Sequence, residues 1–67
     1  MNPIEAIFSF YHDGFFTRRE LNAKLDAIKV RGDWQPGGHW LGFDYQNQQW
    51  VKYASGRVSI GSASQVA

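Results

Sequence analysis

The hydrophobic positions of the first part of the chain repeat at helical spacing. In the stretch NPIEAIFSFYHDG, Asn2 can cap a helix, Pro3 suits its first turn, and Gly14 suits its left-handed end. One face of this helix collects four apolar side chains, those of Ile4, Ile7, Phe8 and Tyr11. The pattern therefore predicts an amphipathic helix that begins near residue 3 and ends near residue 13.

A second amphipathic segment follows in FFTRRELNAKLDAIKVRG. Thr17 and Glu20 have the spacing of a capping box, while Phe16 and Leu21 have that of a hydrophobic staple. The apolar stripe of this helix consists of Leu21, Leu25 and Ile28. Gly32 is expected to end the element. The short link between the two helices predicts an antiparallel helical hairpin.

Beyond the turn segment DWQPGG the hydrophobic period changes to two, which is typical of β-strands. A three-residue loop at 47–49 would place Tyr45 opposite Val51 and Phe43 opposite Tyr53, whereas a two-residue loop would mix apolar and polar faces. We therefore predict the longer loop. The face expected to contact the helices then contains Leu41, Phe43, Tyr45, Val51 and Tyr53.

The remaining residues complete a prediction of the fold. The stretch SGRVSIGS indicates a third short strand around Val58 and Ile60, and residues 62–67 are expected to form a flexible tail. We predict one small α+β domain over residues 1–61. Its two-helix hairpin packs on one face of a two- to three-stranded antiparallel sheet, in the order α-α-β-β-β. Trp40 and Trp50 have the opposite parity and are expected on the outer face.

Length and composition narrow the classes of function. The chain has 67 residues and no cysteine, so disulfides cannot support its small core, and a structural zinc site, normally built from Cys and His, is not expected. No apolar run approaches the roughly 20 residues of a membrane span, and the start of the chain lacks the basic region of a signal peptide. A cytoplasmic protein without membrane contact is therefore expected.

The segment GGHWLGFDYQNQQWVKYASGRV resembles the histidine box of papain-like cysteine proteases, in particular the ubiquitin-specific proteases. In those enzymes a Gly-His-aromatic step opens a strand, and a strand containing Trp returns beside it. The resemblance would make His39 the general base for a cysteine nucleophile. This chain has no cysteine, and Ala54 and Ser55 stand where the family has its acidic orienting residue. We therefore interpret His39 as the polar first residue of a strand.

Basic residues follow one side of the second helix. Arg18, Arg19 and Lys29 could contact phosphates or an acidic protein surface, with Arg31 just beyond them. The pattern G-x-x-T-R-R-E-L followed by a hairpin also resembles the second helix and wing of a winged-helix domain. The chain passes from Ile28 through a glycine-rich turn straight into strand, so no separate recognition helix is available.

Enzyme classes find little support in the sequence. It contains no nucleotide-binding glycine motif, no nucleophile elbow and no paired carboxylates in a predicted pocket, and no cofactor is expected. A metal shared by His12, Asp13 and His39 would require the fold to bring distant residues together. The formal net charge is only +1, so phosphate attraction alone is a weak driving force for binding.

Aromatic residues make up 16% of the chain, which is more ring surface than so small a core encloses easily. We therefore predict a non-enzymatic module that docks on a larger protein and modulates or inhibits it, as small phage or mobile-element proteins do. Its expected anchors are Trp40 and Trp50, with Trp34 at the rim and Arg18, Arg19 and Lys29 as steering charges. The alternative is a small nucleic-acid-binding regulator that uses the second helix. A homodimer is another way to bury the aromatic surplus.

Overall fold

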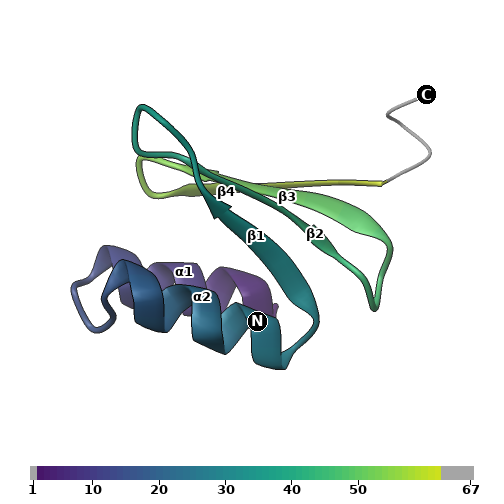
Figure 1. Cartoon of the computed structure of the whole chain (residues 1–67), viewed down its shortest axis with the longest axis horizontal. Coiled ribbons are helices and arrows are strands. Elements are labelled where there is room, and N and C mark those ends of the chain that lie inside the picture. Colours follow the sequence, from purple (N-terminus) through teal and green to yellow (C-terminus); the bar gives the residue numbers. More distant parts are fainter. Residues whose placement is uncertain (1, 63–67) are drawn as a thin grey trace.

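Two helices pack as one layer against a four-stranded antiparallel sheet in the computed structural model, which describes residues 2–62 (Figure 1). The helices are α1 (Pro3–His12) and α2 (Arg18–Ala27). The strands are β1 (Val30–Trp34), β2 (Trp40–Asp44), β3 (Gln49–Ala54) and β4 (Arg57–Ser62), and their order in the sheet is β1-β2-β3-β4. The predicted α+β class is confirmed, with one strand more than the sequence pattern indicated.

Both ends of α1 are satisfied by the residues that the sequence pattern assigned to them. The Asn2 side chain accepts a hydrogen bond from the Ile4 backbone N–H at 2.8 Å, and Pro3 occupies the first helical position. At the other end Gly14 has a φ of 90°, and its N–H donates to the Tyr11 carbonyl. This left-handed glycine ends the helix and turns the chain toward α2.

The predicted capping box at the start of α2 is present. The Thr17 hydroxyl accepts from the Glu20 backbone N–H at 3.1 Å, and the Glu20 carboxylate accepts from the Thr17 N–H at 2.9 Å. These hydrogen bonds also lower the pKa of Glu20. Since two otherwise unpaired backbone donors are satisfied, the start of α2 is fixed locally by its own sequence.

Replacing Thr17 with alanine should lower the free energy of unfolding by about 1 kcal/mol, because the Glu20 N–H loses its acceptor. For a domain of this size, that change lowers the thermal midpoint by about 4–8 °C. Circular dichroism melting would measure it. Thr17→Ser keeps the hydroxyl and should melt close to the wild type; an unchanged midpoint in Thr17→Ala would show that the cap contributes nothing.

Strand β1 occupies residues that the sequence pattern assigned to the end of the second helix and to a turn. Helix α2 ends at Ala27, and Lys29 adopts the left-handed conformation there, with a φ of 64°. The expectation that Gly32 ends the helical element is wrong. Gly32 lies inside β1, opposite Gly42 of β2, where a Cβ atom would overlap the backbone of Leu41. The predicted turn is confined to residues 35–39.

The loop between β2 and β3 has four residues, 45–48, so the predicted three-residue loop is wrong. The reason is Asp44, whose carboxylate accepts hydrogen bonds from the backbone N–H groups of Gln46 and Asn47 and from the side chains of Asn47 and Gln49. This network closes the loop directly after Asp44. Phe43 then lies opposite Trp50 instead of Tyr53.

The changed register reverses the faces of β2. Trp40, Gly42 and Asp44 face the helices and are buried, whereas the predicted inner residues Leu41 and Tyr45 are exposed. On β3 the prediction is right, because Val51 and Tyr53 are buried beneath the helices. The observed pairing differs from the predicted one by three residues, since Phe43 lies opposite residue 50 instead of residue 53. Successive side chains of a strand point to opposite faces, so a shift by an odd number of residues moves every side chain of β2 to the other face.

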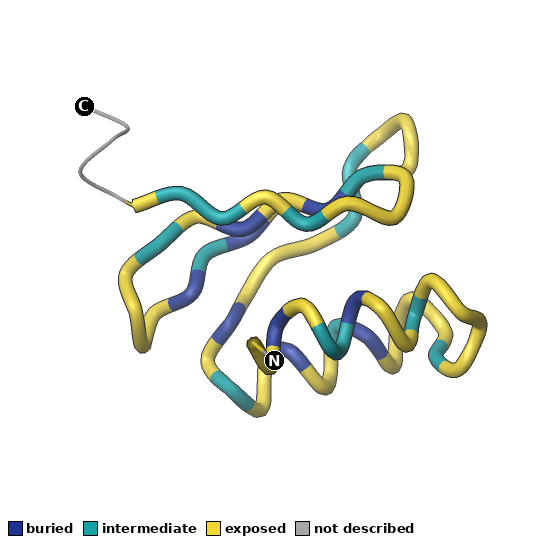
Figure 2. The backbone as a smooth tube through the Cα atoms, turned by 180° about the vertical axis from the view of Figure 1, so that it is seen from behind, coloured by how far each residue is buried: buried dark blue, intermediate teal, exposed yellow. Residues whose placement is uncertain are grey.

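The core lies between the two layers and is rich in aromatic rings. Phe8 of α1 stacks on Tyr53 with a centroid separation of 4.8 Å and meets Trp40 edge-on at 5.3 Å. Aliphatic side chains complete it, namely Ile4, Leu21, Leu25, Val30 and Val51. Figure 2 shows buried positions alternating along the central strands and recurring along both helices. The helices therefore cover one face of the sheet only (Figure 1).

The predicted third strand around Val58 and Ile60 is confirmed as β4, which extends to Ser62. The predicted flexible tail began at residue 62, and its residues 63–67 lie outside the described part of the chain.

Candidate functional site

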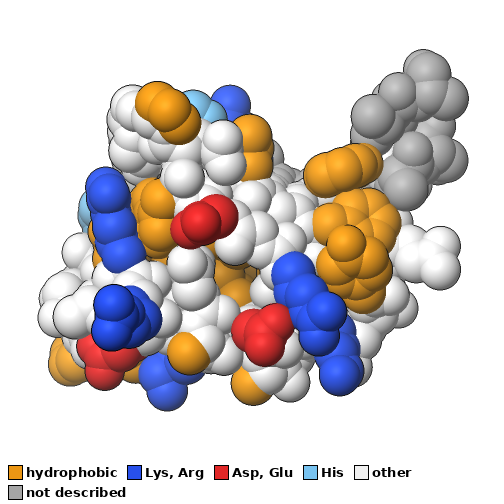
Figure 3. All heavy atoms as spheres, viewed as in Figure 1, with side chains coloured by type: hydrophobic (Ala, Val, Ile, Leu, Met, Phe, Trp, Pro, Cys, Tyr) orange, Lys and Arg blue, Asp and Glu red, His pale blue; other side chains and the backbone are white. Residues whose placement is uncertain are grey.

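The face of the sheet that points away from the helices carries the largest group of exposed apolar side chains on the strands. Four side chains from β2, the following loop and β3 form what we call the outer aromatic patch, which consists of Leu41, Phe43, Tyr45 and Trp50. Leu41 is 41% exposed, Trp50 48% and Tyr45 60%. Figure 3 shows hydrophobic side chains gathered beside basic ones at the end of the sheet that holds the β2–β3 loop.

Phe43 sits at the centre of the patch. Its ring packs edge-to-face against Tyr45 at 5.0 Å and against Trp50 at 4.9 Å between centroids. Edge-to-face pairs at this separation are favourable and hold the rings in fixed positions. The side chains of the patch line a shallow depression, and Arg31 of β1 contributes to its wall. The patch is thus a preformed surface with one cation at its border.

Trp50 lies on the outer face, as the sequence pattern predicted, but Trp40 does not. The Trp40 ring has no exposed surface, and its indole N–H donates to the Asn22 side chain of α2 at 2.8 Å. The prediction that Trp40 is an external anchor is therefore wrong, because the residue joins the sheet to α2 in the core. Leu41, Phe43 and Tyr45, which the sequence pattern places on the inner face, lie on the outer face instead, for the same reason of register.

Trp34, expected at the rim of a binding surface, is half-buried at the end of β1. The Arg18 guanidinium lies 4.4 Å from the centre of its ring, and Arg18 also donates to the Tyr11 hydroxyl at 3.5 Å. Both groups therefore serve contacts within the domain. Arg19 and Lys29 are exposed. The basic side of α2 thus keeps fewer free cations than its sequence suggested.

The position of α2 also bears on the winged-helix resemblance. Only Ile28 and Lys29 separate α2 from β1, and within residues 2–62 the chain has no third helix. As expected from the sequence, the described residues leave no room for a recognition helix between α2 and β1.

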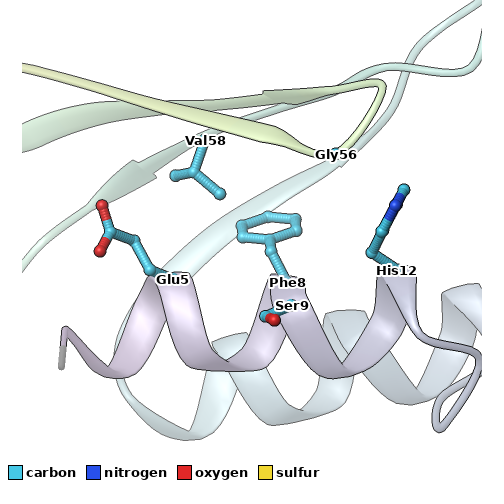
Figure 4. Close-up of a pocket in the computed structure, with 6 residues that line it drawn as sticks. All are labelled: Glu5, Phe8, Ser9, His12, Gly56 and Val58. Atoms are coloured by element: carbon cyan, nitrogen blue, oxygen red, sulfur yellow. The ribbon is translucent and has the colours of Figure 1, made fainter.

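A cleft between α1 and the β3–β4 turn is lined by Glu5, Ser9 and His12 and encloses about 220 Å³ (Figure 4). In Figure 4 Phe8 stands between Glu5 and His12 and points toward Val58. The His12 Nδ1 atom lies 3.1 Å from the Tyr53 hydroxyl. In the described structure, no hydrogen bond joins Ser9 to His12.

The remaining histidine, His39, is half-buried just before β2, and its carbonyl accepts from the Gln35 N–H at 2.7 Å. Its backbone closes the β1–β2 turn. Among the residues that the structure describes, no three His, Cys, Asp or Glu side chains are gathered closely enough to hold a metal ion. His12 and His39 therefore do not form the shared site that the sequence left open.

No protein-family model, curated protein or solved structure matches the chain. Neither of the two described helices is long and apolar enough to cross a membrane.

Proposed function

We propose that this chain is a non-enzymatic protein-binding module that docks on a larger protein through the outer aromatic patch and modulates it. The observation that carries the proposal is the exposure of Trp50, Tyr45 and Leu41 around Phe43, on a sheet face that neither described helix covers. Contiguous exposed apolar surface is unusual on a folded domain unless it serves in recognition, and Trp and Tyr are enriched among the residues that dominate binding energy.

The side chains of the outer aromatic patch are not needed to fill the core. The inner aromatic residues Phe8, Trp40 and Tyr53 already fill the space between the sheet and the helices, and the sheet itself separates them from the patch. Nothing within residues 2–62 covers the outer face. A partner that covered it would bury Trp50 and Tyr45 without disturbing the core.

The roles of the predicted site residues change accordingly. Trp50 remains the main anchor, with Phe43 and Tyr45 beside it, and Trp40 is removed from the docking surface because it is buried. By occupying a surface that the larger protein needs for its own contacts, the module would modulate or inhibit that protein.

Replacing Trp50 with serine should reduce partner affinity by at least about 30-fold, corresponding to about 2 kcal/mol, because truncation of a central aromatic anchor commonly has an effect of this size. The test compares proteins captured by immobilised wild type and Trp50→Ser from nuclease-treated lysate, followed by a titration of each candidate as a purified protein. Phe15→Ser is the matched control, since Phe15 is an aromatic residue of the α1–α2 turn with 68% exposure.

The proposal requires a partner that wild type and Phe15→Ser bind equally and that Trp50→Ser binds weakly. Equal binding by all three proteins would contradict it. Preferential loss of binding in Phe15→Ser would place the docking surface at the α1–α2 turn, where Phe10 and Phe15 pack edge-to-face at 5.7 Å.

A further inference from the structure

We infer that the partner presents an extended acidic segment with one apolar anchor, and that this segment lies along β3 with its carboxylates over Lys52 and Arg57. The inference rests on the proposed docking function of the outer face and names the chemistry of its occupant. It follows from the arrangement of charge and apolar surface on that face.

The outer face is divided along the strands. The row nearest the β2–β3 loop consists of Arg31, Phe43, Trp50 and Gly61, and the next row consists of Asp33, Leu41, Lys52 and Ser59. Beyond these, Ala54 lies opposite Arg57 beside the β3–β4 turn. The aromatic rings therefore occupy one end of the face, and two cations follow toward the other end.

Those two cations are available for a partner. Lys52 and Arg57 are exposed, and neither has an ion pair in the described part of the chain. Asp33 is the one acidic residue in the two rows, but it lies on the edge strand β1 and its side chain is turned toward α2, where the carboxylate accepts from the Asn22 side chain at 3.2 Å; it also accepts from the Trp34 N–H at 2.8 Å. The complementary charge must therefore come from another molecule.

Arg31, the third cation of the face, is engaged differently. Its side chain forms an ion pair with Asp26 of α2 at 3.0 Å. It borders the aromatic end of the face, and its charge is already partly compensated. The uncompensated positive charge is therefore concentrated at Lys52 and Arg57.

The strand spacing defines the expected motif. Trp50 and Lys52 are two residues apart on one face of β3, which corresponds to about 7 Å. A partner segment in extended conformation has the same repeat. An aromatic or aliphatic side chain over Trp50 would therefore be followed, two residues along, by an Asp or Glu over Lys52, and a second acid two residues further would approach Arg57.

The alternatives fit the face less well. Trp50 and Tyr45 could stack nucleic-acid bases, but Lys52 and Arg57 are the only cations of this face without an ion pair in the described residues, and the formal net charge of +1 adds little attraction for phosphates. A second copy of the chain would bring another Lys52 and Arg57 toward a face whose acid is already hydrogen-bonded. An acidic segment with an apolar anchor satisfies both the rings and the cations.

A library of random dodecapeptides displayed on a carrier protein tests the inference, with the full chain as bait. Selection is carried out on the wild type, and the enriched peptides are synthesised and titrated against wild type, Trp50→Ser, Lys52→Glu and the control Phe15→Ser. Circular dichroism confirms that each variant is folded. Binding of a labelled oligothymidylate and the sedimentation of the protein alone are measured in parallel.

The inference predicts enriched peptides in which Asp or Glu stands two residues from an aromatic or aliphatic residue. Their affinity should fall at least tenfold in Trp50→Ser and in Lys52→Glu, and remain unchanged in Phe15→Ser. If the enriched peptides are neutral or basic but still require Trp50 for binding, the inference of an acidic segment is wrong, while the docking surface is supported. No enrichment that depends on Trp50 would overturn both. Trp50-dependent oligothymidylate binding, or dimerisation through Trp50, would assign the face to a different occupant.

Discussion

Replacing Trp40 with alanine should destabilise the domain by about 3–5 kcal/mol, the range found when large aromatic residues are removed from cores. A single core in a chain shorter than about 70 residues rarely supplies more than about 3–5 kcal/mol. The variant is therefore expected to be largely unfolded at room temperature. Urea denaturation followed by circular dichroism would show this as the loss of the folded baseline.

The physical reason is that Trp40 connects three parts of the structure. Its ring has no exposed surface and meets Phe8 of α1 edge-on, its indole N–H donates to Asn22 of α2, and it covers Gly42 in its own strand. Alanine would remove all three contacts and leave a cavity where the two helices meet the sheet.

Trp50→Ala is the matched control, since it removes the same side chain from the outer face of the neighbouring strand. Because Trp50 is 48% exposed, loss of its side chain should change the free energy of unfolding by about 1 kcal/mol or less. If Trp40→Ala unfolded at the same urea concentration as the wild type, the assignment of Trp40 to the core would be wrong.

Replacing Asp44 with alanine should have the second-largest effect, a loss of about 2–4 kcal/mol, because it removes a buried hydrogen-bonded carboxylate and leaves donors of the β2–β3 loop unpaired. Asp44 is 1% exposed and accepts from Gln46, Asn47 and Gln49. Asp44→Asn keeps one oxygen acceptor and should lose less. Equal stability of all three proteins in urea would contradict the role of this network.

The same residue predicts a dependence on pH. Burial raises the pKa of the Asp44 carboxyl, but the hydrogen bonds from Asn47, Gln49 and Gln46 lower it by more. The pKa of Asp44 therefore lies below its usual value. A lowered pKa means that the stabilisation is complete above the unfolded-state pKa of about 3.9 and is lost as the pH falls through the folded-state value. The stability difference between wild type and Asp44→Asn should therefore be full at about pH 6 and shrink below about pH 4. A constant difference across this range would contradict it.

The helical half of the fold could be predicted from the sequence because its signals are local. Asn2, Gly14, Thr17 and Glu20 act on backbone groups within a few residues of themselves, and the structure confirms each of these contacts or conformations. The sequence pattern does not indicate strand β1, because Val30 and Trp34 are its only large apolar side chains and a glycine lies between them. Two large apolar residues four positions apart are too few to distinguish a strand from a turn.

The candidate site depends on a longer-range quantity, the register of the β2–β3 hairpin. The alternation of apolar and polar residues favours an inner face that contains Phe43 and Tyr45, because apolar side chains are expected to point toward the core. The decisive residue is polar: Asp44 is buried because its carboxylate closes the loop. An Asp followed by Asn three residues later is a local turn signal, so the four-residue loop could have been recognised from the sequence. Trp40 and Tyr45 exchange faces as a consequence.

The most direct test of the docking surface is site-specific photo-crosslinking in cells that produce the protein. The photoreactive amino acid p-benzoylphenylalanine is introduced in place of Trp50 in one sample and of Phe15 in another, and covalent adducts are identified by mass spectrometry. We expect an adduct with a larger, different protein from position 50 and little or none from position 15, which is exposed but lies in the turn between the helices. Adducts from position 15 alone would show that the outer face of the sheet is not where the partner binds.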